Sequence, residues 1–564
     1  MRDWLAETHG PTFELLRHFL LRFFDTDLVT SPGQTIVALV GASSMFLSWF
    51  PFVTGPLKDK YAHFSALPTS DSYRLAIRAD HLWLIVMLMA AVGLLTAVKW
   101  QSLFPSLADY RAIGWMPVRS WQVFAAKLGA VLTVATGAVI VLNLLPCAGF
   151  PALSGGRWAF QQSVGRRMVA LGAATVAGSY FTFFALVALQ GVLLNLLRPR
   201  RFARVAGWSQ GVLAAAMLIL LVLSFSIGLP LARAVVRPDL ARWLPPVWFL
   251  GLCQSLSGDP DPQMAVMARW AIQGLVGVIA VVLGVYLVSY RRHRTLMMEG
   301  TAGAKKDRRW LGAIFDRLVP DAREQAAMVF LAKGMWSNGP HRMVLMGYAG
   351  FGLAVLLGGM IGIAGIVGAE RVAAARFVYG HVILLTFLLI GLRHLFSIPV
   401  ELRANWAFRI TEREGRRQWM RAMDRFVWLF GAGTLIILPL PLEVWLLGWR
   451  AVSEPALMTV FGMVCYQALF ASWEKLPFTC SYLPGKKPMW MVALRLFALL
   501  AALPVVNGIL LACLYNPLLF AGVFLAQLAV GIRFHRSRRE AWGELRLRYE
   551  ESPDPAVNTL NLRG

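Results

Sequence analysis

Two ionisable residues lie inside apolar runs in the second half of the chain. His381 falls in the run 377–392, and Glu443 follows the prolines of PLPLE in the run 426–449. An ionisable group inside an apolar run of membrane length is a candidate for handling protons or ions. The alternatives are a hydrogen-bonded structural histidine for His381 and a glutamate at the membrane interface for Glu443. The sequence leaves both alternatives open.

The sequence lacks the common motifs for nucleotide binding and for metal-dependent peptide hydrolysis. It contains no G-x-x-x-x-G-K-[ST] phosphate-binding loop and no HExxH pair. The five cysteines show no CxxC pair and no metal spacing, and a disulfide between Cys147 and Cys253 is left open. We therefore expect no catalytic residue, no metal site and no cofactor bound by this chain.

A polar segment, FPSLADYRAIGWMPVRSWQVFAAK, lies between the apolar runs 82–98 and 128–145. It combines an acid, several bases and aromatic residues that we expect to be exposed. Arg111 and Trp115 are four residues apart, so on a helix they share one face. Arginine and tryptophan are common in binding hot spots, which favours this segment as a docking surface.

A second segment repeats this arrangement about 292 positions later. The shift pairs Phe104 with Phe396, Asp109 with Glu401 and Arg111 with Arg403, and Asn405 follows in ELRANW. The echo and the matching order of elements favour a tandem duplication or a fused pair of modules.

A third polar segment, EKLPFTCSYLPGKKP at 474–488, contains three prolines. Its residues Phe478, Tyr482 and Lys486 offer packing faces and a charge, so we interpret it as a docking loop. The alternative is a loop packed against its own bundle.

The composition is that of a membrane protein. The chain has 564 residues, of which 57% are hydrophobic and 15% charged, and its mean hydropathy is +0.59. Apolar runs of about 17–25 residues recur, each long enough to cross a bilayer. The net charge of +25 is explained by basic inner loops, so we expect the lipid bilayer as a partner and no nucleic acid.

The periodicity of apolar runs predicts an all-α polytopic protein with about twelve transmembrane helices. We expect them at 35–53, 82–98, 128–145, 168–197, 211–231, 270–290, 343–367, 377–392, 426–449, 456–473, 496–511 and 518–532. Placing the N-terminus inside puts most of the 55 lysines and arginines on the inner side. Both termini are therefore expected in the cytoplasm.

Each half is expected to begin with an amphipathic interfacial helix, at 12–25 and at 321–334. The predicted organisation is a first six-helix module at 1–297, a linker at 298–320, a second module at 321–534 and a cytoplasmic tail at 535–564. The short apolar stretch Leu244–Ser257 is either a re-entrant or interfacial helix or a loop packed on the bundle.

The pattern FPxxxDYRxxxxxPVxxxxxFxAK after the second run resembles the first cytoplasmic loop of bacterial ABC-type permeases of the type-2 exporter superfamily. The resemblance is best over residues 10–295, and ELRANW and FTCSYLPGK are similar to long fused permeases of that superfamily. In the family this loop forms a coupling helix that docks into an ATPase subunit. The resemblance places the following residues in that element: Asp109, Tyr110, Arg111, Pro117, Val118 and Lys127.

The resemblance implies a permease subunit of an ATP-driven exporter in the cell inner membrane. Cytoplasmic ATP-binding subunits, two per chain, would supply ATP and Mg, and the chain itself would not be an enzyme. The alternatives are a membrane-embedded lipid-modifying transferase, which needs an acid/base or metal constellation, and a membrane scaffold that transports nothing.

Overall fold

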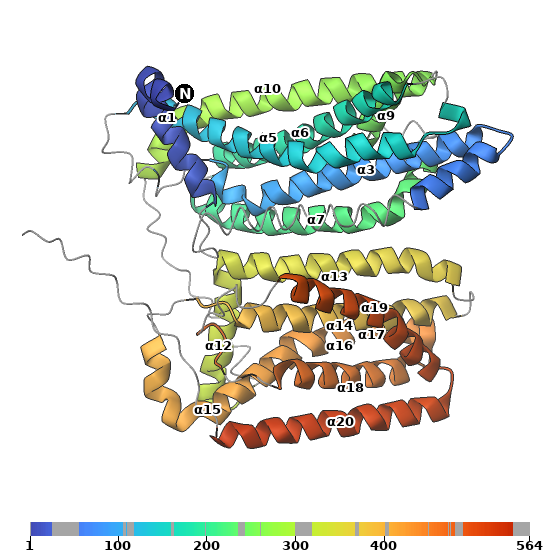
Figure 1. Ribbon diagram of the computed structural model, residues 1–564. Helices are drawn as coiled ribbons and strands as arrows, with labels where there is room; N and C mark the ends of the chain where they lie inside the picture. The colour runs from blue at the N-terminus through green and yellow to red at the C-terminus, as the bar shows by residue number, and fades with distance from the viewer. Residues whose placement is uncertain are drawn as a thin grey trace, which may run out of the picture. The chain divides into compact units, whose positions relative to one another are not determined.

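The computed structural model shows a helical chain (Figure 1), and every regular element within the described residues is a helix. The described residues are 2–24, 56–104, 109, 118–159, 163–197, 199–234, 243–259, 261–298, 319–366, 371–400, 405–448, 450–471, 473, 475–479 and 489–544. The all-α class expected from composition is therefore confirmed for this part of the chain.

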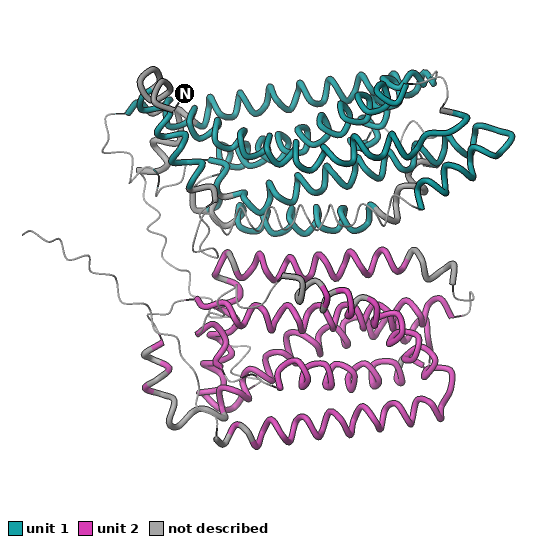
Figure 2. The backbone as a smooth tube through the Cα atoms, in the orientation of Figure 1, with its two compact units in different colours: residues 1–304 teal, residues 305–564 magenta. Residues whose placement is uncertain are grey.

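Two compact units divide the chain, residues 1–304 and residues 305–564 (Figure 2). The division falls inside the linker expected at 298–320. Most of that linker, residues 299–318, lies outside the described residues.

Unit 1 is built from long apolar helices and two shorter ones. The long helices are α3 (Asp71–Val98), α5 (Ser120–Leu153), α6 (Val164–Leu196), α7 (Pro199–Ala234) and α10 (Pro262–Met298). The shorter helices are α1 (Arg2–Phe24) and α9 (Pro245–Ser257), and two 3-10 turns follow α3 and α5, η1 (Trp100–Ser102) and η2 (Arg157–Ala159).

Helix α3 forms the interior of unit 1, because it packs against α5, α6, α7 and α9. In its most apolar part, 72% of the residues are buried, which is the largest share among the long apolar helices that the structure describes. A helix that is apolar on nearly all faces belongs inside a bundle, where other helices cover it.

Helix α1 bends at Gly10, whose φ is +32°, a value that glycine tolerates readily, and Pro11 follows it. After the bend, Leu15 and Phe19 are buried against Val123 and Ala126 of α5. The amphipathic helix expected at 12–25 is therefore a helix that packs its apolar face on unit 1.

Helix α9 covers the stretch expected as either a re-entrant helix or a packed loop. Its 13 residues span about 20 Å, which is too short to cross a bilayer. Val247, Phe249 and Leu250 are fully buried, and Gly258 ends the helix with φ +87°. The stretch is thus a helix, and it packs in the interior of unit 1.

Unit 2 contains one similarly enclosed helix, α14 (Val372–Phe396), with 61% of its apolar window buried. Its other helices are α12 (Ala322–Ser337), α13 (Gly339–Ile366), α15 (Asn405–Val427), α16 (Gly433–Ile437), α17 (Leu440–Leu447), α18 (Arg450–Phe470), α19 (Met489–Cys513) and α20 (Pro517–Glu544). Helix α14 contacts α13, α16, α17, α18 and α19, so the core of unit 2 surrounds it.

The run from α15 to α17 is interrupted twice. A π-helical turn, Trp428–Ala432, joins α15 to α16, and Pro439 separates α16 from α17. A proline has no N–H to donate and breaks a helix at this point, and π turns also disturb the regular bonding.

Nine helices within the described residues are long and apolar enough to cross a membrane. Eight overlap the expected runs from 82–98 to 426–449, and the ninth, in α20, contains the run 518–532. The runs 456–473 and 496–511 fall largely in α18 and α19, which are not among the nine. The first expected run, 35–53, lies outside the described residues. These helices are consistent with a multi-pass membrane protein.

Helix α20 continues through the boundary expected at residue 534 and ends at Glu544. Arg538 and Trp542 are buried within unit 2. The first turns of the expected tail are therefore a packed part of this unit.

Candidate functional site

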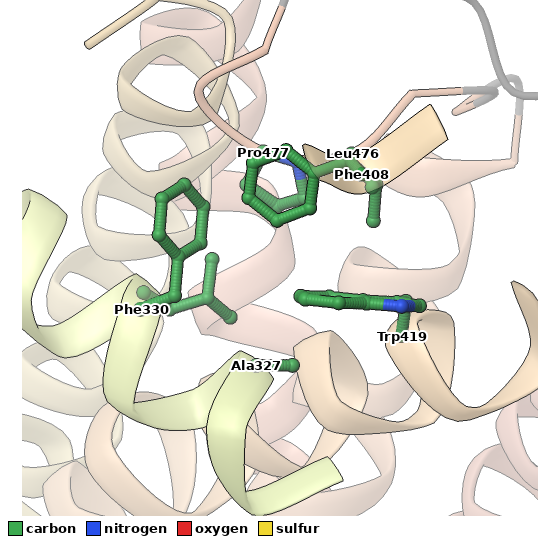
Figure 3. A pocket seen from close by; sticks show the side chains of 7 residues that line it. Ala327, Phe330, Phe408, Trp419, Leu476 and Pro477 are labelled. Carbon is green, nitrogen blue, oxygen red and sulfur yellow. The ribbon is translucent and has the colours of Figure 1, made fainter. Parts of the chain in front are cut away.

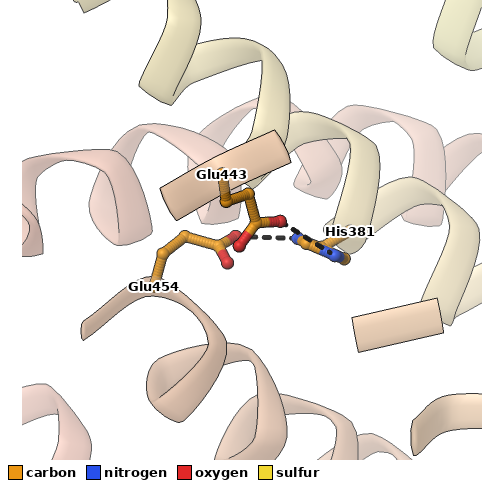
Figure 4. A group of neighbouring side chains, drawn as sticks. All are labelled: His381, Glu443 and Glu454. Carbon is orange, nitrogen blue, oxygen red and sulfur yellow. Dashed lines mark hydrogen bonds and ion pairs between the residues drawn. The ribbon is translucent and has the colours of Figure 1, made fainter. Parts of the chain in front are cut away.

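Three ionisable side chains meet inside unit 2 (Figure 4). His381 comes from α14, Glu443 from α17 and Glu454 from the beginning of α18, and both carboxylates point toward the imidazole ring. All three are buried, and the two glutamates have no exposed surface. One ligand atom from each residue lies within 4.8 Å of the others.

The two ring nitrogens of His381 face different partners. Nδ1 is 2.9 Å from Glu454 Oε1, whereas Nε2 is 3.6 Å from Glu443 Oε1. Nε2 also lies 3.2 Å from the backbone oxygen of Leu435. When the carboxylate of Glu454 accepts the proton of Nδ1, the lone pair of Nε2 points toward two further oxygen atoms.

The carbonyl of Leu435 faces the histidine because the helix is broken there. In an α-helix this oxygen would accept from the N–H four residues later. That position is Pro439, which has no N–H. The proline therefore leaves a backbone oxygen available to the site.

The oxygens of Glu443 are unsatisfied. Neither has a hydrogen-bond partner within the described part of the chain, and the same holds for Oε2 of Glu454. Burying an ionised carboxylate without a donor or a counter-charge is costly. The arrangement can therefore bind a cation or hold additional protons.

The coupling segment predicted in unit 1 is described only at its ends. Tyr110, Arg111, Trp115 and Pro117 lie outside the described residues. Val118 is half-buried beside the cluster of α1 and α5.

Asp109 and Lys127 are buried, so these two charges of the segment are not exposed as expected, whereas Arg119 is exposed. Lys127 Nζ lies 4.8 Å from the ring centre of Phe19 in α1, a cation–π contact. These two residues are therefore part of the packing that holds the segment, because a buried side chain cannot contact a partner.

In unit 2 the structure brings two predicted elements together. Phe478 accepts a backbone hydrogen bond from Val400 and donates one to Phe396. Asn405 is buried and donates from Nδ2 to the carbonyl of Thr479 over 2.8 Å. The segment after α14 and the loop after α18 therefore form one joined structure.

Phe478 is only 1% exposed, so at this residue the loop packs against its own bundle, which is the alternative left open by the sequence. Its ring packs on Phe330, His341 and Phe396. The other residues predicted for these elements, namely Glu401, Arg403, Tyr482 and Lys486, lie outside the described residues.

A small apolar pocket lies beside this joined structure (Figure 3). Phe330 of α12, Phe408 and Trp419 of α15, and Pro477 lie around it. Its lining is formed by the amphipathic helices of unit 2 and the residues just before Phe478. Residues of the loop after α18 therefore lie next to helices α12 and α15 of the same unit.

A second buried polar cluster was not predicted from the sequence. Arg538 of α20 pairs with Asp424 at 2.6 Å and donates to Gln467 and to the hydroxyl of Tyr466. Arg538 falls in the segment that was expected to be a cytoplasmic tail. No sequence signal distinguishes Arg538 from the neighbouring exposed arginines.

Glu454 was also missed, although a signal was available. Glu443 and Glu454 are the two acids between positions 440 and 470, and the stretch around them is apolar. Two acids in one apolar hairpin are candidates for a shared site. Their partner His381 is more than fifty residues away in sequence, so the cluster itself required the fold.

One short sequence motif resembles that of a catalytic serine. GWSQG at 207–211 matches the nucleophile-elbow pattern G-x-S-x-G, which requires a strand followed by a helix. Here the motif lies within α7, and Ser209 donates to the carbonyl of Ala206.

The disulfide left open by the sequence is not formed, because Cys147 and Cys253 are both free thiols.

In comparisons with known proteins, no family model, no curated protein and no solved structure matches this chain.

Proposed function

We propose that the chain is the membrane-spanning permease subunit of an ATP-driven exporter, moved by separate ATPase subunits. The proposal includes twelve membrane spans in two fused modules, cytoplasmic termini and two ATPase subunits per chain. Its substrate would pass between the modules.

The observation that carries this proposal is the anchoring of the polar segment after the enclosed helix of each unit. In unit 1, Phe104 stacks on Tyr286 of α10 at 4.7 Å between ring centres. The Tyr286 hydroxyl donates to the carbonyl of Leu103, and Trp100 is fully buried. The segment thus leaves α3 from a fixed point.

Unit 2 holds the equivalent segment in a different way. After α14, Phe396 and Val400 are joined by backbone bonds to Phe478. A segment that receives a mechanical push must be attached rigidly to the helices that it moves. The anchoring at both positions supports the proposal that these segments transmit movement from the ATPase subunits to the membrane helices.

The transferase alternative requires an acid/base or metal constellation. His381, Glu443 and Glu454 form one, but the glutamates have no exposed surface in this conformation. A substrate cannot reach buried carboxylates, so the cluster favours a structural or ion-binding role over catalysis.

The test is the loss of ATPase binding in the Arg111→Glu, Trp115→Ala double variant. The full chain would be purified from its native membranes, and subunits containing a phosphate-binding loop would be identified by mass spectrometry. We expect two such subunits per chain and ATP hydrolysis in the complex. The variant should bind them at least about 30-fold more weakly, which corresponds to about 2 kcal/mol.

Arg74→Glu is the matched control, because Arg74 is exposed at the opposite end of α3. This variant should retain the ATPase. Equal binding and hydrolysis in the double variant and the wild type would contradict the proposed docking role of the segment.

A further inference from the structure

We propose that His381 and Glu443 bind one divalent metal ion of the zinc class inside unit 2, with Glu454 orienting the histidine. This site is independent of the proposed transport function. It would join α14, α17 and α18 at the break made by Pro439.

The hydrogen-bond pattern assigns the roles of the two glutamates. Metal-binding histidines commonly donate their second N–H to a carboxylate, which fixes the tautomer and the ring orientation. Glu454 Oε1 lies at 2.9 Å from Nδ1 and provides that partner. Nε2 is then the ligand atom, and it faces Glu443 and the carbonyl of Leu435.

The distance between Nε2 and Glu443 favours a metal ion over a proton shared by these two groups. Two ligands that each lie about 2.0–2.1 Å from a tetrahedral zinc ion are about 3.4 Å apart. Nε2 is 3.6 Å from Glu443 Oε1 and 3.2 Å from the oxygen of Leu435. A charged N–H···O hydrogen bond would bring Nε2 and the carboxylate to about 2.8 Å, which is shorter than the contact with Glu443.

The charge balance leads to the same ion class. Two buried carboxylates carry two negative charges, and one imidazolium offsets only one of them. A divalent cation with a neutral histidine offsets both, which matters where burial makes an unbalanced charge costly. A mixed set of nitrogen and oxygen ligands suits zinc better than magnesium or calcium, which prefer oxygen alone.

The unsatisfied oxygens of Glu443 are the second observation that points to a ligand. Glu443 is fully buried, points toward the imidazole and has no hydrogen-bond partner in the described ranges. If protein donors already satisfied these carboxylates, a metal ion would gain little by replacing them. In the neutral tautomer with the proton on Nδ1, the carboxylate and the freed carbonyl converge on a ring nitrogen that has a lone pair.

The experiment is zinc binding to the full chain in detergent, without a polyhistidine tag and after treatment with a chelator. We expect the wild type to retain one zinc ion per chain after dialysis, and its Tm to rise with added zinc. Glu443→Gln should lower the zinc affinity at least about 100-fold. Glu454→Gln should lower it by about 10- to 100-fold, the range for a partner of a ligating histidine.

Glu324→Gln is the matched control for Glu443→Gln. Glu324 is also a buried glutamate of unit 2, but it pairs with Arg425 at 2.6 Å. Its replacement should leave zinc retention unchanged. A stable wild type that retains no zinc would overturn the proposal, as would Glu443→Gln binding zinc as tightly as the wild type.

X-ray absorption of the zinc-loaded wild type keeps the proposal testable if Glu443→Gln does not fold. The spectrum should show oxygen ligands and a single imidazole. A sulfur ligand or several imidazoles would place the ion elsewhere and refute the site.

Discussion

The two units each bury a histidine in their enclosed helix, and the two histidines have opposite surroundings. His81 of α3 has neutral hydrogen-bonding partners, and the positive charge of Arg167 in α6 also acts on it. Gln254 Nε2 lies 3.1 Å from its Nδ1, and the sulfur of Cys253 lies at 3.5 Å. His381 of α14 lies between two carboxylates. The position of a histidine in a bundle therefore does not decide its chemistry, because residues from other helices set the local charge.

The two units also differ in the sign of one buried charge whose polar atoms lack hydrogen-bond partners among the described residues. Arg167 of α6 is buried in unit 1, and its Nε and Nη1 have no hydrogen-bond partner in the part of the chain that the structure describes. The acid Asp80 of unit 1 is well paired, since Lys60 and Tyr61 both donate to it. Glu443 of unit 2 has no such donors. Glu443 is thus a buried anion whose charge a bound cation would offset.

Removing each histidine should show the largest difference between the units. His381→Leu should lower the free energy of unfolding by about 3–5 kcal/mol, because it leaves buried carboxylates without their partner. His81→Leu should cost only about 1 kcal/mol, the usual value for a neutral hydrogen bond. Unfolding by SDS titration in mixed micelles would measure both. Equal losses would show that the surroundings of the two histidines are equivalent in energy.

The ion pairs of the two units should give a smaller difference. Arg538→Met in unit 2 should cost about 2–3 kcal/mol, because its side chain is 3% exposed and bonds to several groups. Arg78→Met in unit 1 should cost about 1 kcal/mol or less, because Arg78 and its partners Asp259 and Asp261 are partly solvated. The same SDS titration would rank the two variants, and the reverse order would contradict this reading of their burial.

Tyr61→Phe should have the smallest effect, about 1 kcal/mol from the lost bond to Asp80. Burial and the adjacent Asp80 raise the pKa of Tyr61 well above its usual value. The hydroxyl therefore stays protonated in both folded and unfolded chains below about pH 10. The difference between variant and wild type should be constant from pH 6 to 9, and stability should fall only where the unfolded tyrosine ionises. A difference that varied within this range would argue against the pairing.

Sequence reasoning predicted the helices well, because membrane length and apolar composition are local properties. It also singled out Glu443, since an acid among apolar residues is visible in the sequence. It did not predict that Glu454 and His381 share a site with Glu443, because tertiary packing brings them together. The role of the Leu435 carbonyl depends on Pro439, and only the fold shows which side chain that oxygen faces.

For the predicted docking elements, by contrast, the sequence did not indicate which side chains are buried. Phe478, Asp109 and Lys127 lie in polar segments that were predicted to dock a partner, yet each is buried. Prolines restrict the backbone of the loop but do not indicate which way an aromatic ring points. Phe478 even has a positive φ of 69°, which is uncommon for a residue with a side chain.

The link between the segment after α14 and the loop after α18 has a consequence for how this region can evolve. Its bonds at Phe396, Val400 and Phe478 use main-chain atoms, and Asn405 reaches a main-chain carbonyl. Main-chain bonds persist when outward side chains are exchanged. The region can therefore accumulate substitutions of its outward side chains while keeping the same architecture.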